Sequence, residues 1–329
     1  RESGFGREGG REGLREYLVR VRHARSAPKP ERGARRKAAA SAAAGRAPVP
    51  ELPPIDRTPK LYIGGKQARP DSGYSLPVAD WRGSHVAEVP AGNRKDIRNA
   101  VEAAHQAQPG WRSATAHLRA QVLYYLGENL AARSAEFAGR VSALTGLDAL
   151  AADAEIARAV DCCFRYAAWA DKWEGAVHHT PYRNVTIAMQ EPVGVVAVVC
   201  PESPSLLGFL ETVLPAVAVG NAVVAVPSQR WPLPATDCYQ LLDTSDVPGG
   251  VINIVTGNRE ELAAVLAAHD DVDGIWYWGT AEGSAQVETL SAGNMKRTWV
   301  DRGAGLHGAD EEFLREATQV KNIWIPYGA

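Results

Sequence analysis

The stretch Pro192–Ser228 constrains the fold of this chain more than any other part of the sequence. Val193–Val199 is a continuous run of β-branched and small apolar residues, which is typical of a strand buried on both faces. After a short Pro- and Ser-rich break, apolar residues recur at helical spacing until Gly220, and Ala222–Val226 forms a second buried run. A strand, a helix and a strand joined by short turns predict a βαβ unit, which crosses over right-handed in a parallel sheet.

The alternation of strands and helices continues after this unit. The sequence predicts, in order, a helix over Ala235–Leu242, a strand over Val251–Val255, a helix over Glu260–Ala268, a strand over Gly274–Trp278, a helix over Glu282–Leu290 and a strand over Thr298–Asp301. Such a series favours the α/β class with a doubly wound parallel sheet. In that class the crevice at the carboxyl ends of the strands is the place to look for function.

The segment before the βαβ unit is predicted to be mostly helical. Leu61–Lys66 has the pattern of a hairpin that turns at its two glycines. Four amphipathic helices follow, the first capped by Asn93 with Asp96 as its capping-box partner, and the third stopped by Gly146. Tyr182–Gln190 alternates in the manner of a strand. The apolar stripes of these helices are read as core.

Positive charge is concentrated at the start of the chain. Residues 1–46 carry thirteen Lys or Arg against five Asp or Glu, so they have a net charge of +8 and the remainder has −10. A basic stretch can contact nucleic acid or acidic lipid, but a solvated segment is the favoured interpretation. Residues 23–57 hold almost no large apolar side chain, so we expect a disordered basic Ala/Pro linker there.

Cysteine usage indicates a reducing compartment. Cys162, Cys163, Cys200 and Cys238 have no metal-ligand spacing and no disulfide pattern, and all four are read as small core residues. We therefore expect no metal site and a cytoplasmic location. The apolar stretch of residues 206–226 is split by polar residues and proline, which favours a core segment over a membrane span. No signal peptide is visible, and the missing starting Met indicates a fragment.

Local features alone point only weakly to a site. Gly279-Thr280-Ala281-Glu282 lies between a predicted strand and helix, where backbone amides at a helix N-terminus can hold a phosphate. A glycine at such a turn more often serves the turn itself. Ser203, Asp301 and His179 do not have the spacing of a recognisable catalytic triad. From the residues alone, the interpretation is an α/β domain with a possible nucleotide site.

Longer motifs, however, occur in a familiar order. From Leu61 to Gly303 the chain resembles the coenzyme-binding half of the aldehyde dehydrogenase superfamily. The matching motifs are YIGG (62–65), FRYAAWADK (164–172), EPVGV (191–195), LPAVAVGN (214–221), GVINIVTG (250–257) and MKR (295–297). The resemblance implies a nicotinamide-binding, Rossmann-like domain over residues 58–303, with a bridging β-hairpin used in oligomerisation.

The two ends of the chain resemble other parts of the same family. Residues 1–22 are similar to the tail of a preceding dehydrogenase module, and residues 304–329 to the family's C-terminal oligomerisation strand. This order resembles the tandem modules of family 16 of the superfamily. The family places its catalytic domain between the positions of Gly303 and Glu311, where this sequence has almost nothing.

Departures from the family's catalytic residues argue against activity. The nucleophilic cysteine of the family belongs to the missing domain, and no cysteine follows Cys238. The oxyanion-stabilising asparagine of the family stands here as Ser203, and a lost donor of that kind costs on the order of 10²–10³ in rate. The family's general-base glutamate aligns with Asp301, which is one methylene shorter.

The cofactor-binding positions are also altered. The ribose-binding Lys-Pro-Ser-Glu of the family reads Val226-Pro227-Ser228-Gln229, and Trp278 stands in the phosphate turn, where we expect it to obstruct the site. The resemblance assigns NAD or NADP as the cofactor, with binding that is weak or absent here. The vestigial contacts that it implies are Val226, Ser228, Gln229, Gly257, Gly279, Thr280 and Glu282.

The sequence therefore predicts a catalytically inactive, aldehyde-dehydrogenase-like module with a role in assembly. Two alternatives remain: a piece of an NAD(P)-dependent aldehyde dehydrogenase whose active module lies upstream, and a module that binds nucleotide weakly. The resemblance implies a homo-oligomer formed through the hairpin and the C-terminal strand, and packing against the upstream module. We expect neither nucleic acid nor membrane as a partner.

Overall fold

A seven-stranded sheet lies at the centre of the computed structural model, which describes residues 59–306 and 308–327. The strand order is β11-β10-β7-β8-β9-β1-β2. Five neighbouring strands are parallel: β7 (Val195–Val199), β8 (Ala222–Val226), β9 (Ile252–Ile254), β10 (Gly274–Tyr277) and β11 (Arg297–Val300). The predicted α/β class and the predicted strands of this series are thereby confirmed.

The βαβ unit forms as predicted. Strands β7 and β8 pair in parallel register, and every residue of both strands is buried. Between them lies α7 (Ser205–Ala218), whose N-terminus has no side-chain cap of its own. Glu155 of α6 satisfies this N-terminus instead, because its carboxylate accepts hydrogen bonds from the backbone N–H groups of Leu206 (3.0 Å) and Leu207 (3.4 Å).

The side-chain amide of Asn221 links the segments at the start and end of this unit. Asn221 is fully buried, and its Oδ1 accepts a hydrogen bond from Gly194 N at 2.8 Å. Its Nδ2 donates to the carbonyl oxygens of Ala216 and Ala317, both at 2.9 Å. The side chain therefore joins the end of α7, the start of β7 and the end of α12 (Asp310–Glu316).

The sheet is mostly parallel but mixed, so the prediction of a parallel sheet holds for five strands and is wrong at one edge. The predicted hairpin exists as β1 (Leu61–Ile63) and β2 (Lys66–Ala68), with Gly64 and Gly65 at positive φ in its turn. It is part of the main sheet, because β1 pairs antiparallel with β9. Leu61 and Tyr62 are buried there, and the edge of the sheet is the short, mostly exposed strand β2. A second hairpin, β3 (Ser75–Ala79) with β4 (His85–Pro90), follows.

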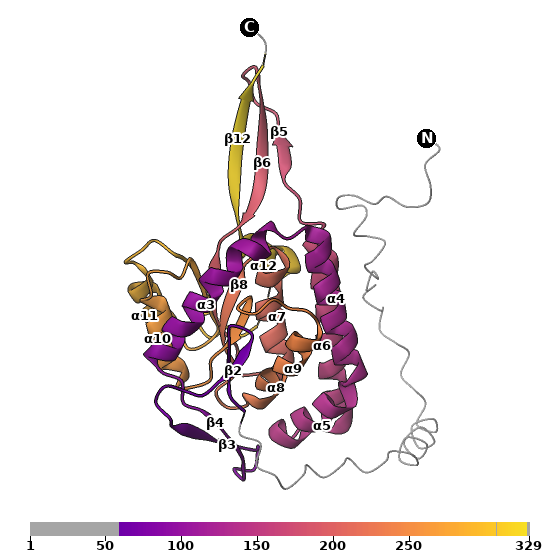
Figure 1. Ribbon diagram of the computed structural model, residues 1–329, viewed down its shortest axis with the longest axis vertical. Coiled ribbons are helices and arrows are strands. Elements are labelled where there is room, and N and C mark those ends of the chain that lie inside the picture. Colours follow the sequence, from indigo (N-terminus) through magenta and orange to yellow (C-terminus); the bar gives the residue numbers. More distant parts are fainter. Residues whose placement is uncertain (1–58, 307, 328–329) are drawn as a thin grey trace, which may run out of the picture.

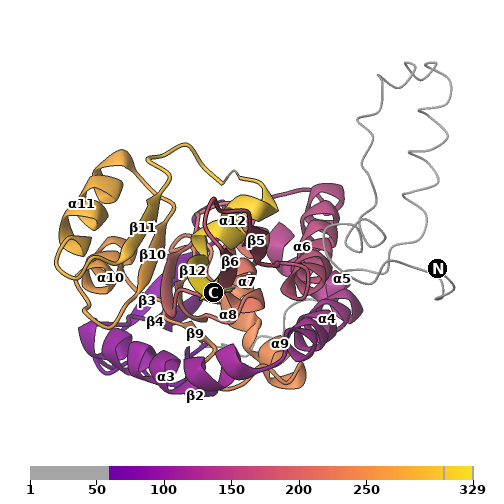
Figure 2. The same ribbon diagram turned by 90° about the horizontal axis from the view of Figure 1, so that it is seen from above.

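Helices cover both faces of the sheet (Figures 1 and 2). One face carries α3 (Arg94–Ser113), α10 (Arg259–Ala267) and α11 (Ala281–Ser291). The other carries α7 with α4 (Ala116–Ala132), α5 (Ser134–Thr145) and α6 (Ala149–Ala170) outside it. The four predicted helices before the βαβ unit are thus confirmed as α3 to α6. The helix predicted over residues 235–242 is instead two short ones, α8 (Leu233–Asp237) and α9 (Tyr239–Thr244), which meet at Cys238.

A smaller sheet projects from the body (Figure 1). It contains β5 (Ala176–His178), β6 (Asn184–Pro192) and β12 (Thr318–Pro326), in the order β12-β6-β5. All nine residues of β12 pair antiparallel with β6, from Thr318 opposite Pro192 to Pro326 opposite Asn184. Its exposed apolar side chains include Val177, Val185, Met189, Val320, Trp324 and Ile325.

Two sequence predictions are limited by what the structure describes. The tail and linker predicted for residues 1–57 lie outside the described residues. Within the part that is described, no helix combines the length and the apolar character that crossing a membrane demands.

A buried lysine gives the fold a pH dependence. Lys296 Nζ donates to the carbonyl oxygens of Ala267 (2.7 Å) and His269 (2.6 Å) at the end of α10, and burial lowers its pKa from 10.5 to about 8. Since the unfolded chain keeps the proton up to about pH 10.5, this group should add stability as the pH rises from 8 to 10. We expect the gain to be on the order of 1–3 kcal/mol in the native chain and absent in Lys296→Met. Urea unfolding of both proteins at pH 7, 8, 9 and 10 measures the difference, and parallel curves would contradict it.

Candidate functional site

The carboxyl ends of β7 and β10 form the crevice in which a site is expected. Strand β7 is flanked by β8 on one side and by β10 on the other. The chain therefore reverses its direction of winding at β7, which is the topological switch point where α/β sheets bind ligands. Cys200, Glu202 and Ser203 follow β7, Ser228 follows β8, and Trp278 follows β10.

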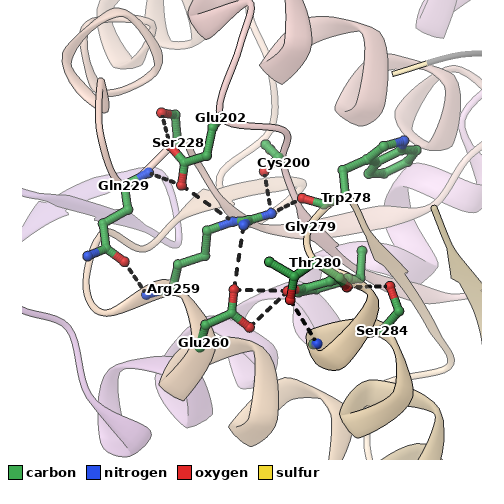
Figure 3. A network of polar contacts seen from close by, with 12 residues as sticks. Cys200, Glu202, Ser228, Gln229, Arg259, Glu260, Trp278, Gly279, Thr280 and Ser284 are labelled. Atoms are coloured by element: carbon green, nitrogen blue, oxygen red, sulfur yellow. Dashed lines mark hydrogen bonds and ion pairs between the residues drawn. The ribbon is translucent and has the colours of Figure 1, made fainter. Parts of the chain in front are cut away.

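A single arginine side chain lies between these strand ends (Figure 3). Arg259 is the first residue of α10 and is only 5% exposed. Its Nη2 donates to the carbonyl oxygen of Cys200 at 3.0 Å and to that of Trp278, so the guanidinium bridges the ends of β7 and β10. The same group lies 5.2 Å from the centre of the Tyr277 ring, within cation–π range.

Two carboxylates flank the guanidinium. Glu202 Oε1 is 3.9 Å from Arg259 Nε, and Glu260 Oε1 is 3.6 Å from Arg259 Nη1. Glu260 also accepts the hydrogen bond of the Tyr277 hydroxyl, at 2.8 and 2.9 Å from its two oxygens. Burial and this contact raise the pKa of Tyr277 to about 12, so the phenol stays neutral and donates.

The residues predicted to bind the ribose are engaged with the same network. Ser228 is buried, and its hydroxyl donates to Glu202 Oε2 at 2.6 Å. Gln229 Oε1 accepts a hydrogen bond from Arg259 N, the amide of the first residue of α10, at 2.9 Å. Val226 is 1% exposed and packs in the core on the face of α3 and α10. These three positions therefore contact the protein itself.

The predicted phosphate turn is also in contact with a side chain of the protein itself, Tyr277. Thr280 is the N-cap of α11, and its Oγ1 accepts a hydrogen bond from Gly283 N at 3.0 Å. A Cβ at Gly279 or Gly283 would overlap the Tyr277 hydroxyl, so that ring lies against the first turn of α11. Glu282 is exposed in the same turn. The amide groups that could hold a phosphate are therefore in contact with the Tyr277 ring, whose hydroxyl is hydrogen-bonded to Glu260.

Gly257 has an internal role. It pairs with Gly92 in an isolated bridge, and a Cβ on it would come within 2.9 Å of the Gly92 carbonyl oxygen. The absence of a side chain at this position is required for the approach of the segment before α3 to the end of β9.

Asp301, the predicted counterpart of a general base, caps a turn. Its Oδ1 accepts hydrogen bonds from Gly279 N (2.9 Å) and Gly303 N (3.2 Å), and its Oδ2 from Gly305 N (3.0 Å). Three backbone donors therefore engage the carboxylate. Ser203 is exposed in the turn between β7 and α7, and no hydrogen bond between described residues joins it to Asp301.

Trp278 blocks the site in a different way from the one predicted. Its ring packs against Trp276, Trp299 and Phe313, with centroids 5.3 to 6.1 Å apart, in the core on the opposite face of the sheet. Only its carbonyl oxygen faces the crevice, where it accepts from Arg259. The prediction that the indole obstructs the site is therefore wrong, and the side chain that lies between these strand ends is Arg259.

The three residues that dominate the crevice were missed from the sequence. The predicted helix begins at Glu260, one residue after Arg259, and Tyr277 lies within the predicted strand Gly274–Trp278. A signal existed at Arg259: it occupies the first position of a helix, where the helix dipole disfavours a cation. A positive charge at that end indicates a compensating anion nearby, which the structure supplies as Glu202 and Glu260.

The four cysteines are buried, as predicted. Burial raises the pKa of each thiol, to about 12 for Cys163 and Cys200. The thiolate, which is the nucleophilic form, is therefore strongly disfavoured at all four positions.

Comparison with known proteins places this geometry in a family. Residues 73–305 match the model of the aldehyde dehydrogenase family. Hydroxyisobutyraldehyde dehydrogenase of Mycolicibacterium austroafricanum is 31% identical over 247 residues, which are 74% of this chain and 49% of that protein. The structure of a putative aldehyde dehydrogenase from Burkholderia cenocepacia has a TM-score of 0.71 at 28% identity, over 75% of this chain and 50% of that one.

A further solved structure is that of an enzyme named for its use of NAD. The NAD-dependent aldehyde dehydrogenase of Sinorhizobium meliloti has a TM-score of 0.72 at 25% identity, and the match covers 75% of this chain and 50% of that one. The chain spans about half the length of the curated relatives that it matches. By the extent of the family match and by the shared fold, the chain belongs to the aldehyde dehydrogenase family.

Proposed function

We propose that this chain is a catalytically inactive aldehyde dehydrogenase module with a structural role in an assembly. The observation that carries the proposal is the position of Arg259, which is bound by two strand-end carbonyls in the crevice. The cysteines add to it, since all four are buried and none follows Cys238 in the sequence. Thioester formation requires an accessible thiolate, and none of the four thiols is suited to supply it.

The residues of the crevice do not fit a nicotinamide dinucleotide. A pyrophosphate carries negative charge, whereas Glu202 and Glu260 flank the only buried cation of the network. Ser228 and Gln229, which would hold a ribose, are bound to Glu202 and to the start of α10. We therefore infer that NAD or NADP binds weakly or not at all.

The projecting sheet supports the assembly role. It presents apolar side chains on a structure that stands away from the body, where Val320, Trp324 and Ile325 are 54%, 58% and 48% exposed. An exposed apolar surface of this kind favours a protein partner. We propose a homo-oligomer formed through β5, β6 and β12, and packing against an upstream module in a family-16-like tandem.

We expect the chain to oxidise no aldehyde and to bind NAD no more tightly than millimolar. NADH formation with short-chain and aromatic aldehydes, measured with thiol-blocked protein as the background, tests the first part. Calorimetric titration with NAD and NADP tests the second. Turnover that survives purification, or a low-micromolar dissociation constant for either cofactor, contradicts the proposal.

One alternative is favoured by a specific observation. The matched relatives are dehydrogenases about twice as long as the matched region, so this chain can be one part of an active NAD(P)-dependent enzyme. Sequence upstream of Arg1 distinguishes the two, because a cysteine in the nucleophile context of the family favours an active parent. A module that binds nucleotide weakly is the third possibility, and the titration above decides it.

A further inference from the structure

The projecting sheet of β5, β6 and β12 is joined to the body at three places, and α12 lies at its base (Figure 1). Residues 171–175 connect α6 to β5, Val193 and Gly194 connect β6 to β7, and Ala317 connects α12 to β12. The contacts at these connections set the direction in which the sheet leaves the body. The connection at Ala317 receives side chains from the main body of the protein.

Arg297, the first residue of β11, reaches this connection. Its Nη1 lies within hydrogen-bond distance of three backbone carbonyl oxygens, those of Arg315 (2.9 Å), Glu316 (3.2 Å) and Thr318 (2.6 Å). The first two are the last residues of α12, and the third is the first residue of β12. One guanidinium on the main sheet therefore holds the end of the helix and the start of the strand together.

The contact suits the chemistry of a helix end. The last carbonyl groups of a helix have no complete set of intrahelical donors, and they carry the negative end of the helix dipole, so a cation with several donors stabilises them. The carbonyl oxygen of Ala317, between the helix and the strand, accepts from Asn221 Nδ2 at 2.9 Å. All four carbonyl groups from residue 315 to residue 318 thus have a donor from outside α12 and β12.

The residue before Arg297 serves a different helix. Lys296 Nζ donates to carbonyl oxygens at the end of α10, which covers the opposite face of the sheet from α12. Adjacent residues of an extended segment project to opposite faces, so two neighbouring basic residues can each hold the end of a helix on a different face. The MKR motif of residues 295–297 thereby acquires a physical role, and the part of Arg297 in it concerns the C-terminal segment.

The place of this contact, at the base of β12, gives it leverage. The nine residues of β12 span about 30 Å at roughly 3.3 Å per residue, so a tilt of about 10° at the base moves the far end by about 5 Å. The core of an interface between two proteins packs as densely as a protein interior. A displacement of that size removes the fit between two surfaces.

We propose that Arg297 is a positioning residue for assembly, which fixes the angle at which the projecting sheet leaves the body. It thereby fixes the surface that the sheet presents to a second copy of the chain. Arg297 lies on β11, outside the projecting sheet, so it acts on the interface through α12 and β12. The inference rests on the homo-oligomer proposed above.

Distances between two spin labels test the positioning directly. One label is attached at Asn322→Cys on β12 and one at Gln121→Cys on α4, both exposed, while the four native cysteines are buried. Dilution into an excess of unlabelled chain restricts the measurement to distances within one chain. We expect Arg297→Met to broaden the distance distribution about 2-fold, and Arg297→Lys to broaden it less, because an ammonium on a shorter stem does not reach three carbonyls.

Sedimentation velocity of the same variants without labels measures assembly. Arg297→Met should weaken self-association about 10-fold, and Arg297→Lys about 3-fold. Arg98→Met removes an exposed arginine of α3 and is the matched control, with no change expected in assembly or in the distances. Amide exchange should speed up in β12 and keep its native rates in β7 and β8, whereas a general loss of stability would speed up both.

The two measurements fail separately. A native chain that stays monomeric contradicts the proposed homo-oligomer, and the label distances then still decide the role of Arg297. A native width in folded Arg297→Met overturns the positioning role. If Arg297→Met does not fold, a native width in Arg297→Lys overturns it. Exchange that speeds up in β7 and β8 as much as in β12 assigns Arg297 to the stability of the whole fold, which also overturns the proposal.

Discussion

Asn221→Leu should lower the free energy of unfolding by about 3 kcal/mol or more. The substitution keeps most of the volume but leaves Gly194 N without its buried acceptor, and it removes one of the two hydrogen bonds that the carbonyl oxygens of Ala216 and Ala317 each accept. An unsatisfied buried donor costs about 1–3 kcal/mol, and each lost hydrogen bond about 0.5–1.5 kcal/mol. Urea unfolding of the full chain, followed by tryptophan fluorescence and circular dichroism, measures the loss.

The control for this prediction is another asparagine. Asn322 lies on β12 and is exposed, so Asn322→Leu should change the unfolding free energy by no more than about 0.5 kcal/mol. Because Asn221 holds Ala317 at the end of α12, amide exchange should also speed up at Val193, whose N–H donates to the same carbonyl. A loss below about 1 kcal/mol would show that the three backbone groups find other partners.

NAD binding should appear only when the crevice is emptied and its contacts are restored together. Val226→Lys with Gln229→Glu restores two residues that the resemblance to the family implies for the ribose. With Arg259 in place, however, its guanidinium still lies between the ends of β7 and β10, so we expect no gain from the pair alone. Addition of Arg259→Ala should tighten binding by on the order of 10²-fold relative to the native chain, at about 1.5–3 kcal/mol for each charged contact.

Four proteins at equal salt test this prediction: the native chain, the pair, the triple variant and the pair with Arg302→Ala. Arg302 is an exposed arginine that is paired with Glu288, so its removal controls for the loss of positive charge alone. Circular dichroism confirms that each variant is folded before the titration. The prediction fails if the pair binds NAD as well as the triple variant does, or if the triple variant is folded and gains nothing.

The central fold could be predicted from the sequence because its signals are local. Val195–Val199 and Ala222–Val226 are short continuous apolar runs, and both became parallel strands buried on two faces. The capping box at Asn93 and the stop at Gly146 also formed as predicted. In each case, residues close together in the chain decide the local backbone conformation.

The errors concern partners that are distant in the sequence. No local feature of Leu61–Lys66 predicts that its first strand pairs antiparallel with β9. This pairing is what makes the sheet mixed. The contents of the crevice were unpredictable for the same reason. Arg259 reaches carbonyls of Cys200 and Trp278, which are 59 and 19 residues away in the chain. A resemblance between motifs identifies positions, but it does not reveal which neighbouring side chain occupies the space between them.

The pairing of β12 with β6 has a consequence for the order of events during synthesis. Lys321 of β12 lies opposite the β6 segment and contacts Glu191, which precedes it by 130 residues. At translation rates of about 5–20 residues per second, β6 leaves the ribosome on the order of 10 s before its partner strand exists. During that interval the β5–β6 hairpin exposes an unpaired edge and apolar side chains such as Met189. The nascent chain therefore has a window in which it needs protection from aggregation, and completion of β12 closes that window.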